Sequence, residues 1–264
     1  MPTRYETITQ AHPSEHVLLV TLDRPAAANA LNTRMGLDLL DLFTDLAVHP
    51  DRCRAVVLTG AGAKAFCAGG DLKERHGMTD AAWEAQHLVF ERMVRALMAC
   101  PMPVVAAVNG AAYGGGCEIA LACDFIYAAR GARFALTEVT LGIMPGAGGT
   151  QTLPRAVGER RAKELLLTGR PFSAEDAASW GMVNRLCDPD ALIPDAVATA
   201  AAITANAPIA VRQAKHAMHH GLGMSLADGM LFEVEAYHRM VPTEDRREGV
   251  RAFNEKRRPV FTGR

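Results

Sequence analysis

The feature that most constrains the fold is a glycine triplet with an apolar run on each side of it in the sequence. Residues 104–108 predict a buried strand, and residues 114–122 predict a helix that opens at Gly114-Gly115-Gly116. Glycine permits a tight turn and a close approach of the backbone because it has no Cβ. A strand that turns in this way into an apolar helix is common in α/β proteins.

The first half of the chain continues this alternation and the second half abandons it. Strands are expected at 17–22, 55–58, 125–128 and 133–136, and helices at 33–48 and 80–100. Beyond about residue 150 the periodic segments are helical, and they are expected at 159–168, 173–180, 189–206, 208–220, 225–240 and 245–256. We therefore expect an α/β core over residues 1–200 and a helical region over residues 201–264.

Length and charge limit the possible partners. A chain of 264 residues suits one large domain with a small appendage, and its net charge of -1 gives no general attraction to nucleic acid or to anionic membranes. No apolar run reaches 18 residues, and the first residues lack the apolar stretch of a signal peptide. The six cysteines, at 53, 67, 100, 117, 123 and 187, form no C-x-x-C pair. We expect a cytoplasmic protein with neither a nucleic-acid nor a membrane partner.

Glu118 follows Gly115 by three residues, so a helix places the two near one face. The N–H of Gly115 would then lie at a helix N-terminus, where the dipole favours negative charge. A first-turn acid also complements that dipole without any function. Since the following residues 119–122 are apolar, the carboxylate is expected to be buried, which is costly unless it is paired or functional. Both interpretations remain open at this point.

Two further runs have a related composition. Residues 66–71 end in Gly69-Gly70-Asp71, and Glu138 precedes a glycine-rich run at 142–149. Two backbone N–H groups aimed at one oxygen form an oxyanion hole, and two glutamates can supply an acid and a base. Glu138 alone could equally be a solvated loop acid. The combination is what an enzyme acting next to a thioester carbonyl requires.

Other chemistries lack their motifs. Neither G-x-x-x-x-G-K-[ST] nor a strand followed by G-x-G-x-x-G occurs, and no serine lies in G-x-S-x-G. His216, His219 and His220 have helical spacing but no acidic partner in register, so no metal site is expected. Cys67 has no obvious base nearby in the sequence and is expected to be a small buried residue.

Several segments together resemble the enoyl-CoA hydratase/isomerase (crotonase) superfamily over nearly the whole chain. They are 105–125 with the glycine triplet, Asp23-Arg24-Pro25, Ala28-Asn29-Ala30, 66–71, 145–150, 168–170 and 253–257. The resemblance implies a spiral of ββα turns with a C-terminal helical trimerisation region. It also implies a homotrimer or a dimer of trimers.

The resemblance further implies which residues act. Gly70 and Gly115 would supply the oxyanion-hole N–H groups, and Glu118 and Glu138 occupy the positions of the glutamates of the hydratase branch. The reaction would be syn addition of water to a trans-2-enoyl-CoA, giving a 3-hydroxyacyl-CoA, with no metal and no prosthetic group. Contacts with the CoA of the substrate are expected at Ala26, Ala28, Ala68, Gly69, Gly70, Asp71, Leu72, Gly115 and Lys256.

Two departures and two alternatives accompany this hypothesis. Ala26 stands where many members have lysine, and Gly70 where alanine is frequent. One alternative is a specialised hydratase for a branched or carboxylated substrate, of the methylglutaconyl-CoA or crotonobetainyl-CoA type. The other is a non-catalytic trimer that binds acyl-CoA or RNA, which the two glutamates and the near-neutral charge disfavour. Acyl-chain preference depends on pocket walls expected within residues 83–97.

Overall fold

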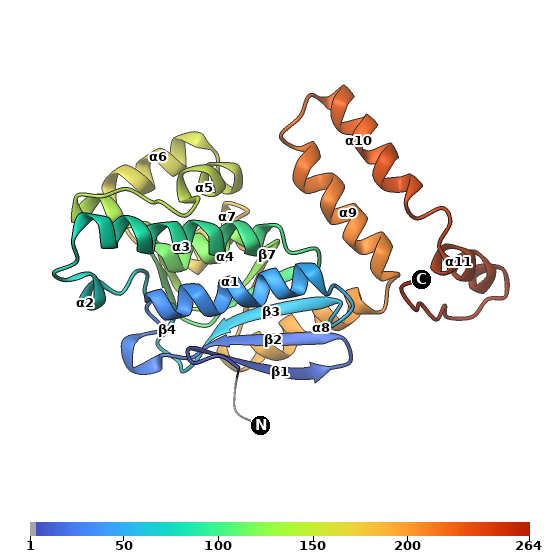
Figure 1. Cartoon of the computed structure of the whole chain (residues 1–264), viewed down its shortest axis with the longest axis horizontal. Helices are drawn as coiled ribbons and strands as arrows, with labels where there is room; N and C mark the ends of the chain where they lie inside the picture. Colours follow the sequence, from blue (N-terminus) through green and yellow to red (C-terminus); the bar gives the residue numbers. More distant parts are fainter. Residues whose placement is uncertain (1–3) are drawn as a thin grey trace.

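The computed structural model describes residues 4–264 and contains two β-sheets with helices packed around them (Figure 1). The larger sheet has the order β1 (Ile8–Ser14), β2 (Val17–Leu22), β3 (Ala55–Gly60), β5 (Val104–Val108), β7 (Phe125–Ala129) and β10 (Arg185–Cys187). The smaller sheet has the order β4 (Ala65–Cys67), β6 (Ala111–Tyr113), β8 (Arg133–Ala135) and β9 (Phe172–Ser173). Neighbouring strands are parallel except for β1 with β2 and β8 with β9.

A unit of two strands and a helix is repeated along the chain. In the pairs β3 and β4, β5 and β6, and β7 and β8, the first strand joins the larger sheet and the second joins the smaller one. Helices follow each pair: α2 (Leu72–Arg75) and α3 (Asp80–Met98), then α4 (Gly115–Ala122), then α5 (Gly149–Val157). The expected spiral of ββα turns is thus confirmed.

The larger sheet is covered on both faces because its central strands are apolar on both sides. Val56 and Leu58 of β3 belong to a core formed with α1 (Thr33–Val48) and α3. Val57 belongs to a second core on the opposite face, where α8 (Leu192–Thr204) packs against the sheet. The α8 residues that enter this core share one helix face and are Leu192, Ala196 and Ala200.

The last helices of the chain lie beyond α8. The boundary placed at residue 200 falls inside α8, which belongs to the core of the larger sheet. Beyond it, α9 (Pro208–Gly221) and α10 (Leu226–His238) lie side by side, and α11 (Glu244–Asn254) follows at the far end of the long axis (Figure 1). Between α5 and α8 lie α6 (Glu159–Thr168), α7 (Ala174–Ser179) and the 3₁₀ helix η3 (Pro189–Ala191).

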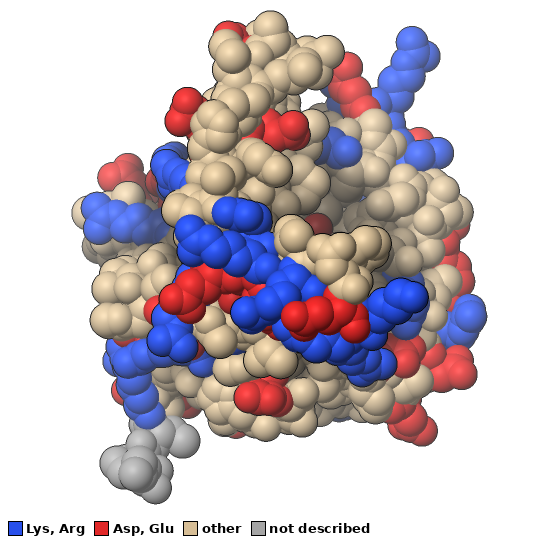
Figure 2. Space-filling model, turned by 90° about the vertical axis from the view of Figure 1, so that its right-hand side faces the viewer, with Lys and Arg blue, Asp and Glu red and all other residues tan. Residues whose placement is uncertain are grey.

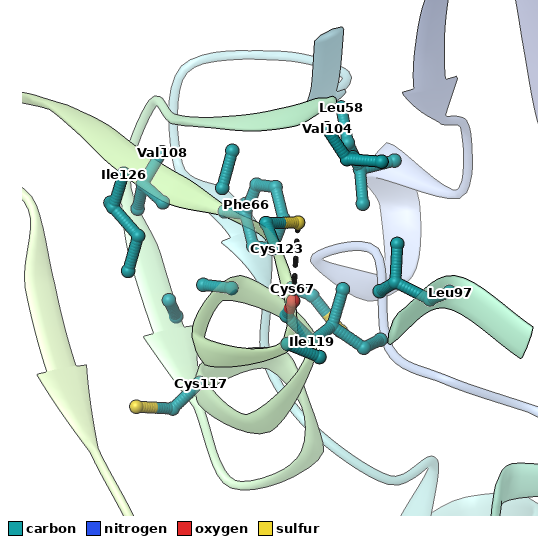
Figure 3. Packing of buried hydrophobic residues seen from close by; sticks show 14 of the residues in the cluster. Leu58, Phe66, Cys67, Leu97, Val104, Val108, Cys117, Ile119, Cys123 and Ile126 are labelled. Atoms are coloured by element: carbon teal, nitrogen blue, oxygen red, sulfur yellow. Dashed lines mark hydrogen bonds between the residues drawn. The ribbon is translucent and has the colours of Figure 1, made fainter. Parts of the chain in front are cut away.

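Helix α4 contacts strands of both sheets and approaches one of them closely. Figure 3 shows Ile119 and Cys123 on the side of Leu58 and Val104, and the Cys123 thiol donates to the Ile119 carbonyl at 3.4 Å. A Cβ added at Gly116 would lie 2.1 Å from the Cys67 carbonyl oxygen, so only glycine permits this approach of α4 to β4. The contact determines where the first turn of α4 lies.

The expected strands and helices are present, with shifts at their ends. Asn32 caps α1, since its side-chain oxygen accepts from the Met35 N–H at 2.9 Å. Five strands had not been predicted: β1, β4, β6, β9 and β10. Four of them have only two or three residues, too few to show a period, and β1 is mostly exposed and lacks an apolar run. Glu138 begins a 3₁₀ helix, η2 (Glu138–Leu141), after the end of β8.

Within residues 4–264, no single helix has both the length and the apolar character needed to cross a membrane. Residues Pro189–Thr204 and Pro208–Gly221 reach that composition only as a pair, which is bent by 106°.

Candidate active site

A cavity of about 570 Å³ brings together most of the predicted site residues. Its walls come from the loop between β4 and α2, the start of α4, the segment from η2 to Ala147, and one face of α3. The predicted residues that line it are Ala68, Gly69, Gly70, Leu72, Gly115, Glu118 and Glu138. Residues that are far apart in the sequence therefore share one cavity.

Two glycine turns place free N–H donors on this cavity. Gly69 and Gly114 adopt positive φ of 93° and 51°, and a Cβ added at Gly114 would lie 3.7 Å from the Cα of Gly69. The two turns thus adjoin. No acceptor in the part of the chain that the structure describes receives a hydrogen bond from the N–H of Gly70 or Gly115. Two free donors from adjoining turns are the components of an oxyanion hole.

The loop that carries Gly70 is anchored on both sides. The Leu31 N–H donates to the Gly69 carbonyl at 2.7 Å, and the Asp71 N–H donates to the Leu31 carbonyl at 2.9 Å. The Asp71 carboxylate accepts from Arg24 at 2.9 Å and from N–H groups of α2. Burial raises the pKa of Asp71, but these hydrogen bonds outweigh it and hold the pKa below its usual value. Asp71 faces these partners and not the cavity, so it acts as an anchor for the loop.

Glu118 is buried and is held as a hydrogen-bond acceptor. It is 3% exposed, and its Oε1 accepts from the N–H groups of Ala147 and Gly149, both at 2.8 Å. Burial raises the pKa of this carboxyl above its usual value, while the two N–H groups favour the ionised form. The two hydrogen bonds therefore hold the Glu118 carboxylate in one orientation.

Glu138 is buried in a different way. It is 8% exposed, and its Oε2 is enclosed without a hydrogen-bond partner among residues 4–264. Burial first, and then the charge of Glu118, raise its pKa to about 7, against the opposing effect of its own backbone N–H. A Cβ added at Gly114 would lie 3.2 Å from Glu138 Oε1, so the carboxyl lies beside the glycine turn. Glu138 can therefore carry a proton near neutral pH.

The two carboxyl groups are suited to opposite tasks. Glu118 accepts hydrogen bonds from two N–H groups and, as a carboxylate, can remove a proton. Glu138 can donate a proton as a carboxylic acid. The free N–H groups of Gly70 and Gly115 can bind an oxygen that gains negative charge. Together they can catalyse proton transfers next to a carbonyl group.

The residues predicted to contact CoA are divided between the cavity rim and the rest of the molecule. Ala28, with φ of 51°, accepts from the Ala68 N–H at 3.1 Å, which brings the turn with Ala26 and Ala28 against the cavity loop. Neither Ala26 nor Ala28 lines the cavity itself. Lys256 follows α11, at the opposite end of the long axis from α2 (Figure 1), so the structure does not bring it to this cavity.

Sequence reasoning missed several residues of the site. Ala147 and Gly149, which hold Glu118, lie in a glycine-rich segment whose role could not be assigned. Of the expected wall, α3 contributes Trp83, Glu84, His87 and Phe90, whereas Leu97 belongs to the core. Arg75 also lines the cavity, and no motif had pointed to it.

The thiol of Cys67 and the histidines of α9 lie outside this chemistry. Burial raises the pKa of the Cys67 thiol to about 11, so this residue is a buried small side chain, as expected. In the described part of the chain no three His, Cys, Asp or Glu side chains are grouped so that they could hold a metal ion. The rings of His216 and His220 meet edge to face, with centroids 4.5 Å apart and an interplanar angle of 69°.

Comparison with known proteins adds an independent finding. The family model for enoyl-CoA hydratase/isomerase matches residues 12–264. The protein YngF of Bacillus subtilis is 49% identical over 251 residues, covering 95% of this chain and 96% of its own. The (E)-benzylidenesuccinyl-CoA hydratase of Thauera aromatica is 41% identical, covering 95% of this chain and 97% of its own. The crystal structure of an enoyl-CoA hydratase from Bacillus anthracis superposes with a TM-score of 0.96 at 43% identity, covering 98% and 100% of the two chains.

Proposed function

The chain belongs to the enoyl-CoA hydratase/isomerase family and is a hydratase of that family, and we propose that Glu118 and Glu138 are its base and its acid. The observation that carries this assignment is the contrast between the two carboxyl groups. Glu118 accepts hydrogen bonds from two N–H groups. Glu138 has a pKa raised to about 7 and lies near two free N–H donors. Hydration needs both a base and an acid, whereas moving a double bond needs one group that shuttles a proton.

The reaction follows from these roles. The thioester oxygen of a trans-2-enoyl-CoA accepts from the N–H groups of Gly70 and Gly115. Glu118 removes a proton from water while the water oxygen attacks the β-carbon, and the electrons of the double bond form an enolate. Glu138 then gives its proton to the α-carbon, which yields the 3-hydroxyacyl-CoA. Glu118 ends protonated and Glu138 ionised, so one proton must return to Glu138 before the next turnover.

The expected stereochemistry and the cofactor requirement are part of the proposal. Glu118 and Glu138 line the same cavity, and the likeness to the hydratase branch implies syn addition, in which both parts of water add to the same face of the double bond. Because the two carboxyl groups make both proton transfers, the reaction uses the CoA thioester without a prosthetic group. The benzylidenesuccinyl-CoA hydratase among the relatives keeps open the alternative of a branched or carboxylated acyl group.

The direct test is hydration of crotonyl-CoA measured across pH by the loss of the conjugated enoyl absorbance. Glu118 must be ionised and its pKa is raised, so kcat/KM should fall as the pH drops through that pKa. Glu138 must be protonated and its pKa is raised to about 7, so kcat/KM should fall again as the pH rises through that value. The two groups interact, so the limbs report the pair. A protein that binds crotonyl-CoA without hydrating it at any pH would support the non-catalytic alternative.

Contacts with CoA are part of the proposal. We place the CoA against the turn with Ala26 and Ala28, where alanine in place of lysine removes one possible ionic contact. Figure 2 shows a band of basic and acidic side chains across the end of the molecule formed by α11, the helix that precedes Lys256. Because Lys256 lies far from the cavity of its own chain, we propose that it contacts the CoA bound by another copy.

Assembly into a trimer or a hexamer is expected from the helices beyond α8. The end of α9 and the exposed face of α10 carry large apolar side chains, and Leu222 and Leu226 are 89% and 82% exposed. The others are Met224, Met230, Leu231 and Val234. Patches of this kind mark protein interfaces. Light scattering at micromolar concentration should therefore give a trimer or a hexamer, and a stable, active monomer would contradict this proposal.

A cytoplasmic location remains our proposal. It is supported by six cysteines that are all buried as free thiols, which suits a reducing compartment.

A further inference from the structure

Arg75 places a positive charge on the cavity wall. The residue ends α2 and is half-buried, and no ion pair with it occurs within residues 4–264. The negative charge of Glu74 favours the protonated guanidinium, but the two side chains form no ion pair. The Glu74 carboxylate instead accepts hydrogen bonds from the Thr33 N–H at 2.9 Å and from Gln86 at 2.7 Å. Burial lowers the pKa of the guanidinium. A partly buried charge of this kind is costly unless an anion pairs with it.

The guanidinium is held in place with its outer nitrogens left free. Its Nε donates to Gln86 Oε1 at 2.8 Å, and Gln86 is 4% exposed and also donates to Thr33 Oγ1 at 2.8 Å. The Cζ atom of Arg75 lies 4.3 Å from the ring centre of Trp83. One edge and one face of the group are therefore occupied, and the two terminal nitrogens remain available for a ligand.

The free nitrogens lie next to the reacting part of the substrate. A Cβ added at Gly70 would be 3.4 Å from both Cζ and Nη1 of Arg75. Gly70 supplies one N–H of the oxyanion hole, so the guanidinium is within reach of a short acyl chain. Arg75 also faces Trp83 and Phe90 of α3, whereas the turn assigned to CoA contacts the loop through Ala28 and Ala68. This placement favours the acyl chain over the CoA phosphates as the source of the anion.

We propose that Arg75 binds a carboxylate on the acyl chain, so that the preferred substrates are short 2-enoyl-CoA thioesters that carry a terminal carboxylate. Arginine pairs with a carboxylate through two parallel hydrogen bonds, which fixes the orientation of the chain as well as its charge. The inference rests on the proposed hydratase function and adds the substrate class.

The test compares two substrates that differ at one end. trans-Glutaconyl-CoA and trans-2-pentenoyl-CoA have acyl chains of equal length that end in a carboxylate and a methyl group. The wild type should have the higher kcat/KM for glutaconyl-CoA. Arg75→Met should lower the ratio of the two kcat/KM values by about 10- to 150-fold, as for the loss of a hydrogen bond to a charged group. Arg75→Lys should give an intermediate ratio, since it keeps the charge and loses the two-pronged geometry.

A matched control is available on α3. Arg95 is exposed and pairs with Glu91 at 2.6 Å, away from the cavity lining. Arg95→Met makes the same chemical change and should leave the ratio as in the wild type. Should Arg75→Met raise KM equally for both thioesters, the guanidinium binds a CoA phosphate and the inference is wrong. An equal loss of kcat for both would instead assign Arg75 to the oxyanion and would also overturn it.

Binding of unreactive thioesters separates this inference from the proposed function. Calorimetry should show that wild-type protein binds glutaryl-CoA more tightly than pentanoyl-CoA. If this preference holds and neither enoyl thioester is hydrated, the hydratase proposal fails while the carboxylate site stands. If hydration proceeds and the wild type shows no preference for the carboxylated member of either pair, the carboxylate site fails alone. The wild-type measurements decide the question even where Arg75→Met does not fold.

Discussion

Glu138→Gln is expected to lower kcat for crotonyl-CoA hydration by about 10²–10⁴-fold, because the amide keeps the shape of the side chain but cannot act as a proton donor of matched pKa. Glu138 has a pKa raised to about 7, and its Oε2 is buried without a hydrogen-bond partner in residues 4–264. The side chain can therefore carry the proton that it donates. Its substitution should change KM much less than kcat. Exchange of the α-proton with solvent deuterium should be suppressed more strongly by this variant than by Glu118→Gln.

Glu118→Gln should give a loss of the same order for the opposite reason. The amide oxygen can still accept from Ala147 and Gly149, so the fold should survive, but the group can no longer remove a proton from water. If both residues act in one transition state, the losses should not add in the double variant. Glu164→Gln, on the exposed face of α6, is the matched control. If Glu138→Gln hydrates crotonyl-CoA at the wild-type rate, Glu138 takes no part in the reaction and a mechanism with one carboxylate is required.

Gly115→Pro should remove one donor of the oxyanion hole and raise the barrier by at least about 2.7–4 kcal/mol, which is about 10²–10³-fold in rate. Gly115 is the first residue of α4, a position where proline is tolerated because its N–H has no partner within the helix. The fold can therefore survive the change, and circular dichroism should confirm it.

Gly115→Ala is the control that separates the donor from the added bulk. Its Cβ would lie 3.7 Å from Leu31 Cδ2, an ordinary contact, and its N–H is retained. The alanine variant should therefore stay much closer to the wild type than the proline variant. A folded Gly115→Pro enzyme with near wild-type turnover would refute the assignment of Gly115 to the oxyanion hole.

Local patterns in the sequence were sufficient for features that depend on neighbours along the chain. The apolar run at 104–108 predicted a buried strand, and Asn32 predicted the start of α1. The spacing of Gly115 and Glu118 placed both on one side of α4, and both line the cavity. Each of these features lies within a few residues of its cause, so periodicity and capping determine it. The resemblance to the family supplied the partnership of Gly70 with Gly115 and of Glu118 with Glu138.

Only the tertiary structure decided the electrostatic state of the site. Glu138 looked like any loop acid, and its raised pKa results from burial under other segments and from the charge of Glu118, twenty positions away. The N–H groups that hold Glu118 come from residues 147 and 149, beyond two further strands. Arg75 became a candidate binding residue because Gln86 and Trp83 on α3 hold it beside Gly70. Desolvation and charge interactions depend on distance in space. Local patterns in the sequence therefore determined the longer strands and helices, and the packing of the fold determined the short strands and the chemistry of the site.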